Sequence, residues 1–177
     1  GVSPPHNVPV QLDFVLDAWP KEQKDLHLIL MGDGAEKEKL KEQALSLKIT
    51  NITFLDSTSK DEVPNVLSLM DVSLVPLKKS DLFKTVIPSK IFENSAMQIP
   101  ILLGVEGESA ELVKSFSAGL CFEPENKTDF LEKLKLLKEN KDLYLKCQEG
   151  CLSLAKSFDR KKMASDMRKQ LNQLVRS

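Results

Sequence analysis

Residues 71–104, DVSLVPLKKSDLFKTVIPSKIFENSAMQIPILLG, contain two short apolar runs with a polar stretch and an amphipathic stretch between them. The apolar runs, 72–77 and 100–104, are nearly continuous, which is typical of strands buried on both faces of a parallel sheet. The stretch between them contains Pro88. Proline is favoured at a helix start because its ring fixes φ near the helical value and because an N–H group there would have no partner within the helix. We therefore predict a helix over 89–97 and a strand–helix–strand unit with parallel strands.

The same alternation continues on both sides of this unit. The pattern predicts strands at 26–31, 52–55, 72–77, 100–104 and 119–122, and helices at 35–47, 61–70, 89–97, 109–115, 128–139, 141–156 and 160–175. Helices cover both faces of such a sheet, so we infer a doubly wound parallel α/β fold. Residues 1–157 are expected to form the domain. Residues 158–177 are expected to hold a C-terminal helix, whose apolar stripe of Met163, Met167 and Leu171 needs a covering surface.

The composition excludes several classes of protein. The 177 residues suffice for one domain with a core, because 41% of them are apolar. A formal net charge of −1 argues against a nucleic-acid or polybasic membrane binder, and 6% aromatic residues leave few platforms for base stacking. We therefore expect no nucleic-acid partner.

Cysteine and histidine usage indicates a reducing compartment. The three cysteines form no C-x-x-C motif and the two histidines, His6 and His27, lie far apart, so we expect neither a disulfide framework nor a zinc site. No apolar run approaches the roughly 20 residues that span a bilayer, and no secretion signal is visible. We expect a cytoplasmic protein.

The chain opens with GVSPPHNVPV, without an initiating methionine, so we also expect it to be part of a longer protein.

Ligands of an open parallel sheet bind beyond the carboxyl ends of the strands, so the segments after the strands are the candidate sites. Gly32 and Gly34 follow the first strand, where glycine permits a tight turn and a close approach to a nucleotide. They also suit a plain strand-to-helix turn, and the dinucleotide fingerprint G-x-G-x-x-G fails because Lys37 stands at its third glycine. Asp56, after the second strand, can hydrogen-bond a base edge or simply form a turn.

The most informative segment leads into the predicted helix 89–97. A helix N-terminus offers free amides and about half a positive charge, which suits a phosphate. Lys84 and Lys90 add full positive charges, and Glu93, one turn into the helix, can accept hydrogen bonds from the two hydroxyls of a ribose. The alternative is that Lys90 and Glu93 are solvated charges on a helix surface.

Acidic residues crowd the start of the helix predicted at 109–115. Glu106, Glu108 and Glu111 suit the positive end of a helix dipole, so capping is the favoured interpretation. Three acids are also reminiscent of a magnesium site, but nothing in their spacing fixes a geometry. We expect no metal site.

Five segments in order, LILMGDGAEKEKL, NITFLD, LMDVSLVPL, TVIPSKIFENSAMQIPILLG and SAGLCFEPEN, resemble the carboxyl-terminal half of the retaining glycosyltransferases of family 4. The likeness is to the branch that builds bacterial surface polysaccharides, and it covers roughly residues 26–137. It implies the GT-B architecture, in which two Rossmann-like domains face each other across a cleft. This chain would be the half that holds the nucleoside-diphosphate sugar donor, without a tightly bound cofactor, and the N-terminal acceptor domain would be absent.

The resemblance also implies roles for individual residues. The family has two glutamates with seven residues between them; the second falls on Glu93, which implies ribose binding. The first falls on Thr85, a departure from the pattern at the position that faces the reacting centre. The residues expected to bind or act on the donor are Gly32, Gly34, Asp56, Lys84, Thr85, Val86, Ile87, Ser89, Lys90 and Glu93. The family also clamps the diphosphate with an arginine and a lysine, and residues 1–19 contain neither.

One hypothesis and two alternatives follow. The full enzyme is expected to transfer a sugar from a nucleoside diphosphate to a glycan or lipid-linked acceptor with retention, at the inner face of the membrane, while this chain alone transfers nothing. The first alternative is a nucleotide-sugar 2-epimerase of the same architecture. The second is a non-catalytic α/β interaction module, in which GDG and PSK are only turns and caps.

Overall fold

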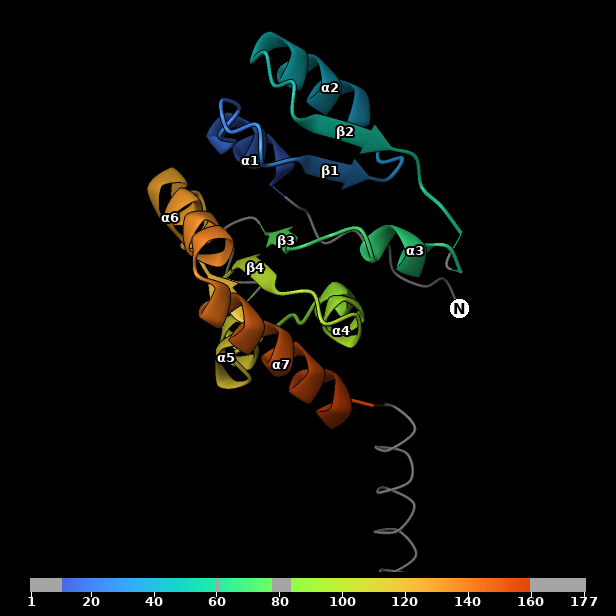
Figure 1. The fold of residues 1–177 in the computed structure, drawn as a ribbon. Coiled ribbons are helices and arrows are strands. Elements are labelled where there is room, and N and C mark those ends of the chain that lie inside the picture. Colours follow the sequence, from blue (N-terminus) through green and yellow to red (C-terminus); the bar gives the residue numbers. More distant parts are fainter. Residues whose placement is uncertain (1–10, 60, 78–83, 160–177) are drawn as a thin grey trace, which may run out of the picture.

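The computed structural model describes residues 11–59, 61–77 and 84–159, which alternate between helices and strands (Figure 1). The helices are α1 (Leu12–Ala18), α2 (Lys37–Ser46), α3 (Val63–Leu67), α4 (Ser89–Ala96), α5 (Glu108–Ser115), α6 (Lys127–Glu139) and α7 (Lys141–Ser157). The strands are β1 (Leu28–Met31), β2 (Ile52–Leu55), β3 (Ser73–Pro76), β4 (Ile101–Gly104) and β5 (Gly119–Cys121). Each strand predicted from an apolar run is present, so the predicted α/β fold is confirmed.

The strand pairs are parallel, as predicted, and they form two sheets. β1 pairs with β2, with Leu28 opposite Ile52, and the second sheet has the order β3–β4–β5, with Ser73 opposite Ile101. The expected single sheet is therefore divided between β1 and β3. Side chains join the two parts, because Leu28 of β1 and Leu102 of β4 belong to one apolar cluster.

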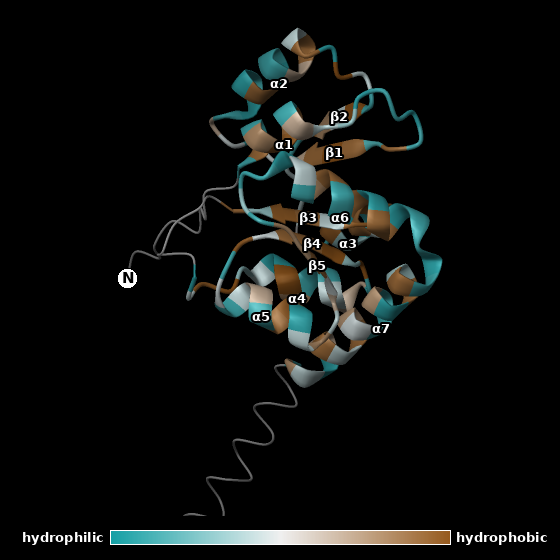
Figure 2. Ribbon diagram, turned by 90° about the vertical axis from the view of Figure 1, so that its left-hand side faces the viewer, coloured by the Kyte–Doolittle hydropathy of each residue, from teal (hydrophilic) through white to brown (hydrophobic). Residues whose placement is uncertain are grey.

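Two apolar clusters form the core. The first is centred on Phe130 of α6, which is fully buried and lies against Phe14 of α1 and Phe122 after β5, with ring centroids 6.1 Å and 5.2 Å away. The second joins the β3–β4–β5 sheet to α4, α5 and α7 and includes the fully buried Ile91 and Leu154. In Figure 2 the strands are mostly apolar, whereas the helices carry both hydrophilic and hydrophobic residues.

Three helices end in the same kind of turn before the next strand. Lys48 after α2, Gln98 after α4 and Ser117 after α5 have φ of 56°, 56° and 54°, a left-handed conformation that is common just beyond a helix. The amide of the residue after each one donates a hydrogen bond to a carbonyl oxygen in the last turn of the helix. These bonds are Ile49 N to Ala44 O at 2.9 Å, Ile99 N to Asn94 O at 3.0 Å and Ala118 N to Val113 O at 2.9 Å. None of the three is glycine, so each turn carries the steric cost of a Cβ in this conformation.

Helix α7 packs directly on two of these turns. A Cβ at Gly150 would collide with the carbonyl group of Ser117, so the close approach depends on the absence of a side chain at residue 150. The next residue, Cys151, is fully buried, and its Sγ donates to the carbonyl oxygens of Ala118 at 3.1 Å and Ile99 at 3.3 Å. Burial raises the pKa of the Cys151 thiol to about 11, so the thiol keeps the proton that it donates.

Two helices differ from the sequence-based expectation. Helix α1 is not among the predicted elements, although Val15, Leu16 and Trp19 lie at helical spacing and are buried. Helix α3 covers Val63–Leu67 instead of the predicted 61–70, and none of its residues is buried. A helix with so little buried surface gains little from packing, which accounts for its short length.

The predicted helix 160–175 and the lead-in with His6 lie outside the described residues. The separate segment 158–177 therefore stays a prediction. Within 11–59, 61–77 and 84–159, no helix has both the length and the apolar character needed to cross a membrane.

Candidate functional site

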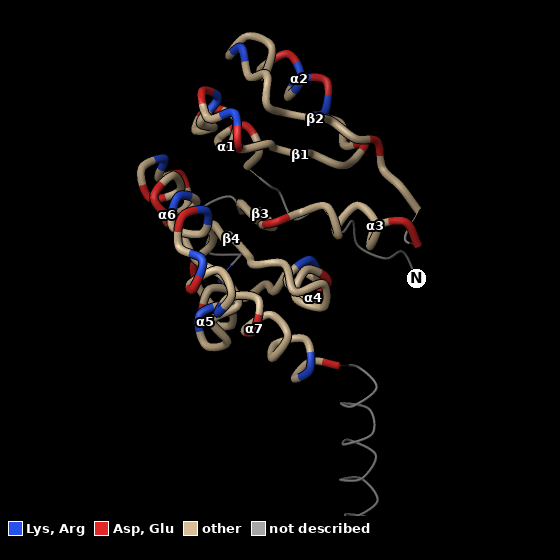
Figure 3. Tube along the Cα trace, in the orientation of Figure 1, with Lys and Arg blue, Asp and Glu red and all other residues tan. Residues whose placement is uncertain are grey.

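The loops beyond the carboxyl ends of the strands hold the candidate residues. The strands themselves carry no charged side chain, and the acidic and basic residues lie on the helices and loops (Figure 3). The segments that matter are 32–34 after β1, 56–59 after β2, 84–88 before α4 and 105–107 after β4. The chemistry at this edge depends on how these loops are held.

The segment 84–88 is attached to the loop between β4 and α5. The amide of Glu108 donates to the carbonyl oxygen of Lys84 at 2.7 Å, and the fully buried Ser109 hydroxyl donates to the carbonyl oxygen of Val86 at 2.6 Å. Gly107 has φ 89° and ψ −149°, a conformation that is essentially restricted to glycine. A Cβ there would lie 2.6 Å from Lys84 Cα, so the two loops touch only because residue 107 is glycine.

Two of the acidic residues around the start of α5, Glu106 and Glu111, have basic partners. Glu106 Oε2 lies 3.9 Å from Lys84 Nζ, and Glu111 Oε1 lies 3.9 Å from Lys114 Nζ. The Lys84 ammonium is therefore partly neutralised. Among the described residues, no three acidic, histidine or cysteine side chains come together as metal ligands, so the magnesium interpretation of these acids gains no support.

Helix α4 presents the charged residues expected at the diphosphate and ribose. Pro88 is the N-cap, with φ −62° and ψ 136°, and no side chain caps the first turn. The inner face is fixed by Ile91 in the core and by Asn94, whose amide donates to Ser73 Oγ at 2.6 Å. Lys90 and Glu93 lie on the exposed face, and within the described residues their side chains make neither a hydrogen bond nor an ion pair, either with each other or with other groups.

Of the remaining residues in this segment, Thr85, Ile87 and Ser89 are exposed and Val86 is half-buried. These four residues precede or begin α4. The structure brings Lys84 and Val86 against the β4–α5 loop, a contact that the sequence reasoning missed. The signal for it is Gly107 within GVEG, where a glycine precedes a helix.

Gly32 and Gly34 lie in the loop after β1, and both have open space where a side chain would be. Gly32 has φ 147°, and a Cβ at either position would meet no atom within 4 Å. The intervening Asp33 accepts the amide of Ser57 at 2.9 Å and also the Ser57 hydroxyl, and these bonds hold the pKa of Asp33 below its usual value. The loops after β1 and β2 are thus joined.

Lys37 also connects the loops after β1 and β2. It stands at the position where the dinucleotide fingerprint has its third glycine. Its Nζ lies 2.6 Å from Asp56 Oδ1, 3.2 Å from Asp33 Oδ1 and 3.1 Å from the carbonyl oxygen of Leu55. The hydrogen bond to Asp56 and the one to Asp33 raise the pKa of Lys37, so the ammonium stays charged. Asp56, expected at a base edge, is therefore already in contact with a cation.

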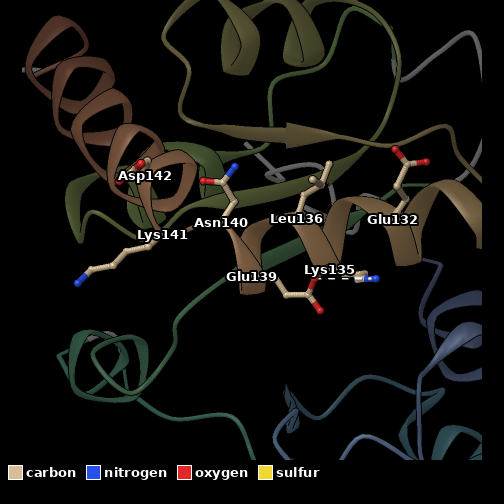
Figure 4. Close-up of a pocket in the computed structure, with 7 residues that line it drawn as sticks. All are labelled: Glu132, Lys135, Leu136, Glu139, Asn140, Lys141 and Asp142. Atoms are coloured by element: carbon tan, nitrogen blue, oxygen red, sulfur yellow. Dashed lines mark ion pairs between the residues drawn. The ribbon is translucent and has the colours of Figure 1, made fainter.

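A surface hollow lies elsewhere, at the junction of α6 and α7 (Figure 4). Its seven lining residues fall between Glu132 and Asp142, and they include none of the residues predicted for the site. Lys135 and Glu139 form an ion pair there at 3.9 Å, and Asn140 caps α7 by accepting the amide of Leu143. These interactions stabilise the two helix ends and bring no reactive group into the hollow.

Parallel strands covered by helices, with glycine-containing loops at the carboxyl ends, define the Rossmann-like α/β class of domain. The model of the family named glycosyl transferases group 1 matches residues 9–151. The chain belongs to this family. No curated protein matches the sequence significantly.

Several solved structures have the same fold. The structure of HepE from Anabaena with UDP and glucose has a TM-score of 0.76 and 16% identity, over 92% of this chain and 45% of that one. Sucrose-phosphate synthase from Thermosynechococcus elongatus has a TM-score of 0.78 and 14% identity, over 96% and 43%. WaaG, a glycosyltransferase involved in lipopolysaccharide biosynthesis, has a TM-score of 0.69 and 17% identity, over 84% and 40%. The chain spans less than half the length of each of these structures, and at these identities the likeness shows the GT-B fold alone.

Proposed function

We propose that this chain is the donor-binding half of a retaining glycosyltransferase of family 4, from the branch that builds surface polysaccharides. The complete enzyme transfers a sugar from a nucleoside diphosphate to a glycan or lipid-linked acceptor, with retention at the anomeric carbon. The family match over residues 9–151 supports sugar transfer, and the complex of HepE with UDP and glucose supports a nucleotide donor. The role of WaaG in lipopolysaccharide biosynthesis supports the acceptor class. The same matches favour transfer over the 2-epimerase and over the interaction module.

One observation carries the proposal: segment 84–88 is held against the β4–α5 loop at the start of α4, beside the exposed Lys90 and Glu93, which have no partner among the residues that the structure describes. The free amides of α4 and the Lys90 ammonium face the diphosphate in this proposal, and Glu93 binds the ribose hydroxyls. Thr85 stands at the reacting centre in place of the family's first glutamate. The sugar and diphosphate path is lined by Lys84, Val86, Ile87 and Ser89, and the base lies toward Gly32, Gly34 and Asp56.

The chemistry assigned to these residues is electrostatic. Transfer with an oxocarbenium-like transition state leaves negative charge on the departing diphosphate, and preorganised donors stabilise that charge. Lys84 is partly neutralised by Glu106, so the principal cation on the described surface of this segment is Lys90. The donor is a substrate, and the proposal needs no tightly bound cofactor or metal.

The remaining parts of the proposal concern the whole protein. Residues 1–157 form the donor domain, and the helix of 158–177 crosses to an acceptor domain in the N-terminal half. The complete enzyme works in the cytoplasm, at the inner face of the membrane where a lipid-linked acceptor is available.

Calorimetric titration of the chain with UDP, GDP and ADP tests the proposal. One nucleotide is expected to bind more tightly than the others, and Glu93→Ala should weaken its binding about tenfold or more, because hydrogen bonds to a charged group are worth about 1.5–3 kcal/mol each. Glu42→Ala, which removes an exposed carboxylate from the middle of α2, is the matched control and should leave the affinity unchanged. Equal affinity of the parent and Glu93→Ala would contradict the assignment of Glu93.

A further inference from the structure

Lys37 is a largely buried cation beside the loops that follow β1 and β2. Its side chain is 13% exposed, whereas Asp33 and Asp56, the two carboxylates that it joins, are 52% and 89% exposed. A lysine ammonium has three donors, and Asp33, Asp56 and the carbonyl oxygen of Leu55 supply three acceptors. No donor is left for a phosphate, so Lys37 serves another purpose than holding the diphosphate.

The arrangement ties the two loops together twice. Lys37, from the first turn of α2, holds Asp56 at the end of β2, and Asp33, from the loop after β1, holds the backbone and hydroxyl of Ser57. Asp33 and Lys37 also bond to each other, so the four residues form a continuous chain of contacts. Each loop is thereby fixed relative to the other.

Of these four connected residues, Asp56 is the one with an unused acceptor atom. Its Oδ1 is engaged by Lys37, and its Oδ2 has no hydrogen bond or ion pair within the described residues. An aspartate as exposed as Asp56 ordinarily samples several rotamers, and the bond to the Lys37 ammonium favours one of them. The result is a fixed carboxylate oxygen at the carboxyl end of a parallel strand, ready to accept an N–H group.

We propose that Lys37 is a positioning residue for nucleotide recognition, which holds Asp56 so that its free oxygen accepts a ring N–H of the donor's base. This inference rests on the proposed function. Uracil and guanine each carry a ring N–H on the edge that hydrogen-bonds in base pairs, whereas the corresponding ring nitrogen of adenine carries no proton and would face the carboxylate oxygen with a lone pair. The edge of the sheet therefore selects UDP or GDP over ADP.

Calorimetric titrations with UDP, GDP and ADP test the inference through a ratio of affinities. The parent chain should prefer UDP or GDP to ADP by about tenfold, the size of one hydrogen bond to a charged group. Lys37→Met and Asp56→Ala should each reduce that preference to about twofold or less, without weakening ADP binding, and the double variant should lose no more. Lys37→Arg should retain part of the preference. Lys39→Met, which removes an exposed lysine from the same helix, is the matched control and should retain all of it.

The possible results separate this inference from the proposed function. A purely structural role of Lys37 would weaken all three nucleotides equally, so an unchanged ratio in Lys37→Met would overturn the inference. Equal affinity of the parent for the three nucleotides would overturn it too, with donor binding left standing, and no binding at all would overturn both. Should Lys37→Met fail to fold by circular dichroism, Lys37→Arg tests Lys37 in its place, and an unchanged ratio in Asp56→Ala, which alters an exposed side chain, still overturns the inference.

Discussion

Gly107→Ala should separate the loop before α4 from the loop after β4. The new Cβ would lie 2.6 Å from Lys84 Cα and would collide with the Lys84 carbonyl oxygen, and φ 89° with ψ −149° is not a conformation that alanine adopts readily. One of two costs follows. Either residue 107 keeps its backbone under strain, or the loops move apart and their hydrogen bonds are lost.

Both routes have a similar magnitude. Holding a residue with a Cβ in such a backbone region costs about 1–3 kcal/mol. Moving the loops apart breaks the bonds of Glu108 N to Lys84 O and of Ser109 Oγ to Val86 O, each with a net worth of about 0.5–1.5 kcal/mol. We therefore expect Gly107→Ala to lower the free energy of unfolding by about 1–3 kcal/mol.

Urea unfolding measures the free energy, and hydrogen exchange of the Glu108 amide identifies the route. Faster exchange of that amide indicates separated loops, and unchanged exchange with a lower stability indicates strain. Gly34→Ala is the control, because a Cβ at Gly34 meets nothing within 4 Å, and it should change stability by less than about 0.5 kcal/mol. If Gly107→Ala is as stable as the parent and protects Glu108 equally, the contact between these loops is not as described.

Three further substitutions test the core, a helix end and the buried thiol. Phe130→Ala removes a fully buried ring and should lower the free energy of unfolding, measured in urea, by about 3–5 kcal/mol. The neighbouring Leu131→Ala changes a side chain that is 37% exposed and should lower it far less. Equal losses in the two variants would refute the buried position of Phe130. Gln98→Gly relieves a Cβ at φ 56° and should raise the urea midpoint by the equivalent of up to about 1 kcal/mol, while Gln98→Ala, which keeps a Cβ, should not; a destabilised glycine variant would show that the turn is not left-handed. The pKa of Cys151 is raised from 9.0 to about 11, so as pH rises above 9 the thiol of the unfolded chain ionises before that of the folded chain, and the free energy of unfolding falls. Cys151→Ala should show a smaller fall between pH 9 and 11. An equal fall in both proteins would refute a protonated buried thiol.

The strands and most helices follow from local pattern. The run ILLG is continuous in apolar residues because it is covered on both faces, and this property is visible in the sequence itself. The run LILM is equally continuous, although only Leu28 in it is buried and Met31 is exposed. Helix α1 could not be predicted in this way. Its apolar residues have helical spacing, but the helix is only seven residues long and depends on packing against α2 and α6. The division into two sheets depends on pairing between strands, which no single segment specifies.

The candidate site divides in the same way. The helix start at Pro88 and the exposed Lys90 and Glu93 were predictable because they are properties of one segment. The partners of Lys84 and Lys37 were not, because Glu106 lies 22 residues after the first and Asp56 lies 19 residues after the second, and only the fold brings these groups together. A lysine in the sequence shows a charge, and its three-dimensional neighbours decide whether that charge is free for a ligand.

The contact of α7 with the turns at Ile99 and Ala118 has a consequence for the order of folding during synthesis. Gly150 and Cys151 are made about 30 residues after Ser117 and Ala118, the turn that they cover, and about 50 after Ile99. Until they leave the ribosome, the β3–β4–β5 sheet lacks one wall of its core, and the carbonyl oxygens of both turns lack the thiol donor. We therefore expect the nascent chain to remain loosely packed and open to proteolysis until residue 157 has emerged, and to become resistant in a single late step.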